Sequence, residues 1–209
     1  DSIVAVLPEM DPHEAALSVH RVAALAADGH TEPARFAAHP SLRGEWLPLV
    51  LRRFSDGWFV RTGNRRYDAL FGRRILRIGG LPIETVADRV GAFVSSDNRI
   101  GAFDDIGNAM RLSAVLAAVG AVDSVGADVP VTVEEGAEGE RTVFIRPGEE
   151  SWVTGEWMDA DEVTTDAPPP LYRSIESNYG YRYVRRDSMG YVWFGEIRDE
   201  GSESIEEFF

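Results

Sequence analysis

The chain has 209 residues, of which 44% are hydrophobic and 27% are charged, a composition typical of folded domains. Its formal net charge of −14 argues against non-specific binding to nucleic acid, which needs a basic surface. The chain has no cysteine, which excludes disulfides and cysteine-ligated zinc, and it has no apolar run long enough to predict a membrane span.

All 21 basic residues are arginine, so no mechanism that needs a lysine amine is open to this chain. The chain begins at Asp1 and carries no charged-then-apolar leader, so we expect a processed or cut terminus. Residues 2–7 form a short apolar segment that suits either a helix or a strand. Asp11 and Pro12 then favour a helix start, and an apolar face extends over residues 12–27. We expect Gly29 to end this helix in the left-handed conformation.

Period-two patterns replace the helical spacing from about residue 46. Residues 46–51 and 58–61 read as paired strands around a turn at 55–57, and Gly63-Asn64 predicts a second turn.

The stretch from residue 70 to 83 organises the centre of the chain. Gly72 opens it, residues 75–78 suit a buried strand, and Gly79-Gly80 predicts a turn. A helix is expected over residues 84–90. This order of glycine, strand, Gly-Gly turn and helix resembles the central unit of PDZ-type modules.

The second half of the chain continues the alternation. Asp97-Asn98 and Gly101 indicate a loop, residues 104–119 suit one helix, and residues 129–145 suit a hairpin. An aromatic hairpin is expected over residues 179–196, and a helix start over 203–209.

These patterns predict an α+β protein in four parts. We expect an N-terminal helical region over 1–44, a PDZ-like β-module with helices over 45–148, a linker or covering segment over 149–177, and a β-hairpin with a helix start over 178–209.

The order of these parts resembles the front half of the C-terminal processing and tricorn-core-like serine peptidases. Its most specific residues are Asp28-Gly29-His30-Thr31 after an apolar helix, and the resemblance extends from about Asp11 to Phe209. The resemblance implies that the last part begins an incomplete catalytic core, because the nucleophilic serine of that family lies beyond the matching region.

The resemblance also implies that His30 is the catalytic histidine that serves this serine. Imidazole is a natural acid or base near neutral pH. In tricorn-like members a serine precedes the histidine, whereas Gly29 does so here. The alternative is that the His30 ring only holds its loop through a backbone hydrogen bond.

Other candidate residues favour structural roles. His13 and His20 are seven positions apart, whereas metal-binding pairs on helices prefer four, so we expect no metal. Arg73, Arg74 and Arg77 could bind a peptide carboxylate, or they could lie on the solvent-exposed face of a strand. The residues that bind substrate stay unassigned.

The predicted function is a non-catalytic portion of a serine-type endopeptidase that contributes peptide binding or gating and the histidine. The alternative is a peptide-binding or scaffold module without enzymatic activity. The resemblance implies a peptide or unfolded-protein substrate, the missing C-terminal core as a partner, no cofactor and an extracytoplasmic or secreted location. We expect an uncovered apolar face on the aromatic hairpin, which Trp152 and Trp157 or a second copy of the chain would cover. No serine lies in a sharp glycine-flanked turn that would present its hydroxyl, and the resemblance implies that the second half of the core is missing, so we expect no peptide hydrolysis by this chain alone.

Overall fold

The computed structural model describes residues 3–31, 41–42, 45–136, 139–148, 157–160, 178–195, 199, 204 and 206. The chain divides into two compact units, Asp1–Thr164 and Thr165–Phe209. Helices and antiparallel sheets occur together, which confirms the α+β class. Among the described residues, no helix has both the length and the apolar character needed to cross a membrane.

The N-terminal part of the first unit is helical. Residues Ile3–Val6 form α1, a 3-10 turn (η1) covers Leu7–Glu9, and α2 spans Pro12–Ala24. The predicted cap is confirmed, because the Asp11 carboxylate accepts a hydrogen bond from the His13 backbone N–H at 2.8 Å.

The end of α2 differs from the prediction. The helix stops at Ala24, and the positive φ belongs to Ala27, at 50°, while Gly29 has none. The prediction of a left-handed Gly29 is therefore wrong. Gly29 instead makes a tertiary contact, because its backbone N–H donates to the Asp97 side chain at 2.8 Å.

A hairpin follows, as predicted. Strand β1 (Leu49–Phe54) pairs with β2 (Gly57–Asn64), and β7 (Trp157–Asp159) pairs with the other edge of β2. The predicted turn at Gly63-Asn64 is wrong, because both residues lie inside β2. A Cβ at Gly63 would meet the Pro48 carbonyl at 2.6 Å, so this glycine permits a close approach of the backbone just before β1.

The turn comes one residue later. Asn64 caps the 3-10 helix η3 (Arg65–Leu70) by accepting from the Arg66 N–H at 3.0 Å. The central unit then forms as predicted, with β3 (Ile75–Ile78), β4 (Leu81–Pro82) and α3 (Ile83–Gly91). Gly79 has a φ of 61°, and a Cβ there would collide with the Ala121 carbonyl, so the turn requires glycine.

The helix predicted over residues 104–119 is two helices, α4 (Arg99–Ala109) and α5 (Ser113–Ala118). The Asn98 side chain starts α4 by accepting from two backbone N–H groups, which places Gly101 in the helix and not in a loop. The helices separate because Leu112 is extended and forms a bridge with Trp46.

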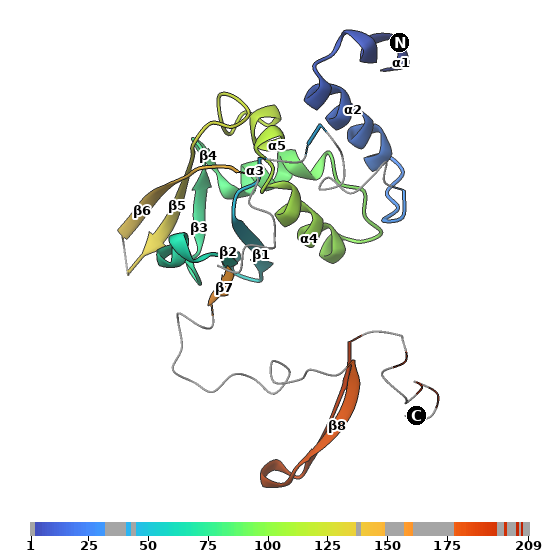
Figure 1. Ribbon diagram of the computed structural model, residues 1–209, viewed down its shortest axis with the longest axis vertical. Helices are drawn as coiled ribbons and strands as arrows, with labels where there is room; N and C mark the ends of the chain where they lie inside the picture. The colour runs from blue at the N-terminus through green and yellow to red at the C-terminus, as the bar shows by residue number, and fades with distance from the viewer. Residues whose placement is uncertain are drawn as a thin grey trace. The chain divides into compact units, whose positions relative to one another are not determined.

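The sheets and the helices share one core. Strands β5 (Val129–Glu135) and β6 (Gly139–Ile145) form the predicted hairpin and complete a four-stranded sheet of order β4-β3-β5-β6. Figure 1 shows α3, α4 and α5 grouped beside this sheet and β1. Among the largest fully buried side chains are Leu47, Trp58, Leu70, Ile75, Met110, Leu116 and Ile145.

The second unit holds the predicted aromatic hairpin. Strand β8 (Tyr179–Val184) pairs antiparallel with β9 (Met189–Phe194). The short 3-10 helix η5 (Arg185–Asp187) connects the two strands. Tyr181 and Val192, which are opposite each other, are 76% and 61% exposed.

Several predicted features lie outside the described residues. These are Trp152, the linker segment apart from 157–160, and the helix start at 203–209 apart from two isolated positions. The four predicted domain boundaries stay predictions.

Candidate functional site

The predicted catalytic histidine lies in a short turn that Asp28 organises. The Asp28 carboxylate accepts a hydrogen bond from the His30 backbone N–H at 3.0 Å and another from the Thr31 hydroxyl at 2.8 Å. These bonds hold the pKa of Asp28 below its ordinary value. The bond from the His30 backbone has the larger effect, and the bond from the Thr31 hydroxyl has the next largest. Asp28 is therefore a carboxylate at neutral pH.

A second carboxylate, Asp97, reaches this turn from the loop between α3 and α4. Asp97 Oδ1 accepts from the Gly29 backbone N–H at 2.8 Å. In the same loop, the Ser95 hydroxyl donates to the Asp28 carbonyl at 2.7 Å. The Asp28 backbone N–H also donates to the Ser95 hydroxyl at 3.3 Å, so three hydrogen bonds attach the segment after α2 to the loop after α3.

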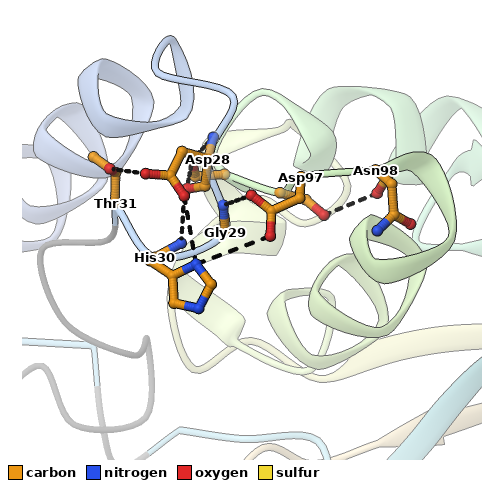
Figure 2. Close-up of polar contacts among 8 residues, drawn as sticks. Asp28, Gly29, His30, Thr31, Asp97 and Asn98 are labelled. Atoms are coloured by element: carbon orange, nitrogen blue, oxygen red, sulfur yellow. Dashed lines mark hydrogen bonds and ion pairs between the residues drawn. The ribbon is translucent and has the colours of Figure 1, made fainter.

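The His30 ring faces both carboxylates through one nitrogen. Nδ1 lies 3.5 Å from Asp28 Oδ1 and 4.0 Å from Asp97 Oδ2. Figure 2 shows the other ring nitrogen, Nε2, pointing away from both carboxylates. The His30 side chain is 91% exposed, so Nε2 is open to a molecule that approaches from solution.

A comparison with His13 separates the local geometry from the tertiary one. His13 also follows an aspartate by two positions, and its Nδ1 lies 3.1 Å from Asp11 Oδ1. The Asp-x-His spacing alone therefore brings a carboxylate to Nδ1 in both turns. His30 differs because the distant Asp97 adds a second carboxylate.

These residues also have the donor types of a metal site. One ligand atom each from Asp28, His30 and Asp97 lie within 4.8 Å of one another. Carboxylate oxygen and imidazole nitrogen are ligands for divalent cations such as zinc. The prediction that the chain binds no metal stays a prediction.

The arginines considered for peptide binding contact their own fold. Arg73 Nε donates to the Ala69 carbonyl at 2.8 Å, and Arg77 pairs with Glu140 on β6. His20 is buried in α2, and among the described residues neither it nor His13 belongs to a cluster of possible metal ligands. Arg73 and Arg77 thus make contacts within the fold, and the expectation of no metal at His13 and His20 stays a prediction.

Asp97 is the residue of this site that the sequence did not indicate. The Gly29–Asp97 hydrogen bond joins residues 68 positions apart. In the sequence, Asp97 belonged only to a loop signal with Asn98. Its role depends on the docking of that loop against the end of α2, which no short motif encodes.

Comparisons with models of known protein families, with curated proteins and with solved structures find no match to this chain.

Proposed function

We propose that this chain is the histidine-bearing, peptide-admitting part of a serine endopeptidase related to the C-terminal processing and tricorn-like peptidases. The observation that supports this proposal is the His30 ring, with carboxylates 3.5 and 4.0 Å from Nδ1 and with a side chain that is 91% exposed. A histidine that acts as a general base needs one ring nitrogen held by a carboxylate and the other free to accept a proton.

The two ring nitrogens of His30 would have different roles. The carboxylates of Asp28 and Asp97 favour the tautomer with the proton on Nδ1, which leaves Nε2 as the acceptor. When Nε2 takes the proton of a serine hydroxyl, both carboxylates stabilise the imidazolium. Among the described residues no serine hydroxyl hydrogen-bonds this ring, so the nucleophile would come from another part of the protein.

The module over residues 45–148 would admit the peptide. In the PDZ-like interpretation, an extended peptide adds as a further strand to a sheet edge. Strand β6 is the last in the order β4-β3-β5-β6, and among the described residues it pairs with β5 only. Phe144 on this strand is 67% exposed and offers an apolar contact for a peptide side chain.

The second candidate is a peptide-binding or scaffold module without chemistry. The same free edge of β6 favours it, because strand addition needs no catalytic residue. A serine-directed covalent probe separates the two candidates. Labelling of the full gene product that depends on His30 supports the peptidase, and binding of peptides without labelling supports the module.

The central experiment measures peptide cleavage by the full gene product. We expect His30→Ala to lower kcat/KM by about 10²–10⁴-fold, the usual contribution of a general base. His13→Ala is the matched control, because His13 has the same local Asp-x-His geometry but no second carboxylate. The catalytic role is wrong if His30→Ala cleaves as fast as the unchanged protein.

A further inference from the structure

A groove of about 380 Å³ lies between α2 and α5, away from the His30 turn. Its floor is apolar, and its most deeply buried side chains are Leu17, Phe93 and Ala114. Ala117 and Ala118 extend the floor along α5. Because three alanines contribute only methyl groups, the floor leaves space for an aliphatic or small aromatic group of a ligand.

A cation stands at one end of this groove. The Arg21 guanidinium lies 4.9 Å from the centre of the Phe93 ring, which holds it by a cation–π contact. Among the described residues no carboxylate lies within 4.0 Å of Arg21. Its N–H groups are therefore available to a ligand carboxylate, which guanidinium binds through two parallel hydrogen bonds.

Carboxylates stand at the other end. Asp11 and Glu14 line the groove in the first turn of α2. Asp11 already caps the helix, whereas Glu14 has no ion-pair partner within the described part of the chain. Glu14 is thus placed to bind an ammonium group.

The spacing of these charges selects the ligand. Glu14 and Arg21 are seven residues apart on one helix, which corresponds to about 10 Å along its axis. A free amino acid carries its ammonium and carboxylate on the same carbon and cannot span this distance. An extended peptide advances about 3.3–3.6 Å per residue, so two or three residues fit.

We propose that this groove binds a short apolar peptide of two or three residues that has free termini. Its ammonium group pairs with Glu14, its carboxylate pairs with Arg21, and an apolar side chain lies on Ala117 and Ala118. The site uses none of the residues around His30, so it does not depend on the proposed peptidase function.

Isothermal titration calorimetry of the 209-residue chain tests this proposal with alanyl-leucyl-alanine as the probe. We expect saturable binding of one peptide per chain. Acetylation of the amine, amidation of the carboxylate, and replacement of the peptide by free leucine should each weaken binding by about tenfold or more. Equal binding of the amidated peptide, or of free leucine, would overturn the assignment of the ends.

Variants locate the peptide in the groove. Arg21→Gln should weaken binding of the peptide with a free carboxylate by about tenfold and leave binding of the amidated peptide unchanged. Only the free peptide has a carboxylate that pairs with Arg21. Arg146→Gln on the protein surface is the control for the same change in net charge. Ala118→Phe should block binding by filling the floor, without removing a charge. The proposal fails if the unchanged chain is folded and does not bind the probe, or if Arg21→Gln and Ala118→Phe both bind it unchanged.

Discussion

The backbone N–H of Gly29 donates to the Asp97 carboxylate at 2.8 Å, across 68 positions of the sequence. This hydrogen bond places Asp97 beside the His30 ring, where its other oxygen lies 4.0 Å from Nδ1. The candidate site therefore depends on Gly29, which contributes a backbone N–H and has no side chain. A Cβ at Gly29 would lie 3.0 Å from Asp97 Oδ2, closer than side chains normally approach.

Replacement of this glycine should loosen the contact. We expect Gly29→Val to displace Asp97 and to speed hydrogen exchange of the residue-29 amide by about tenfold, as expected for a lost hydrogen bond of about 1.4 kcal/mol. Exchange measured by NMR is the test. Gly80→Val is the control, because a Cβ there would meet nothing within 4 Å. Unchanged exchange at position 29 would show that the contact does not hold the turn.

The turn should also make stability depend on pH through Asp28. Its pKa in the folded protein lies below the ordinary value, first because of the His30 backbone N–H and then because of the Thr31 hydroxyl. The folded state therefore binds this proton less readily than the unfolded chain does. The resulting stabilisation is present above the unfolded pKa of about 3.9 and is lost as the pH falls through the folded pKa.

Urea unfolding of Asp28→Asn measures this effect. We expect the unchanged chain to be more stable than the variant at pH 7, and the difference to shrink below about pH 4. Asp88→Asn, at an exposed position on α3, is the control for the same change in charge. A constant difference for Asp28→Asn over this range would contradict the expected linkage.

A glycine at position 27 should stabilise the protein. Ala27 has a φ of 50°, a conformation that costs a residue with a Cβ about 1–2 kcal/mol. Ala27→Gly removes this strain but adds unfolded-chain entropy, so we expect a gain of about 0.5–1 kcal/mol in the free energy of unfolding. Ala23→Gly in α2 should instead lower the free energy of unfolding by about 1 kcal/mol. Equal losses in both variants would refute the strain at Ala27.

The buried Arg111 gives a prediction about the core. Its guanidinium lies 5.3 Å from the Trp46 ring and 5.6 Å from the Trp157 ring, and burial lowers its pKa to about 10. Arg111→Ala should cost about 3 kcal/mol, because it leaves a cavity between the rings.

Arg111→Met should cost only about 1 kcal/mol, because methionine fills the space without a buried charge. Denaturant unfolding followed by tryptophan fluorescence reports both stability and the environment of the rings. The surface variant Arg146→Ala should change stability by less than about 0.5 kcal/mol. Equal costs for the alanine and methionine variants would show that the charge, and not the packing, stabilises this region.

The 209-residue chain by itself should not hydrolyse peptides. A serine peptidase needs a nucleophile, a base and donors for the oxyanion, and in the described part of the chain no serine hydroxyl contacts His30. The test exposes the purified chain to an unfolded protein and to a serine-directed probe. Cleavage or labelling that one Ser→Ala change abolishes, for instance at Ser188, would refute this expectation.

Local signals in the sequence determined most of the fold. The Asp11 cap, the Gly79-Gly80 turn and the hairpins all form where the sequence predicted them, as does the helix after Pro82. The sequence signal for each of these features comes from residues within a few positions of one another. Caps, glycine turns and period-two alternation can therefore be recognised in the sequence without knowledge of any distant contact.

Tertiary contacts decided the rest, including the candidate site. Gly63 resembles a turn residue, but it permits the approach of the Pro48 backbone. The helix predicted over residues 104–119 breaks because Leu112 bridges to Trp46. Asp97 joins His30 only because the loop after α3 docks on the end of α2. In each case the partner lies far along the chain, and its position exists only once the core has packed.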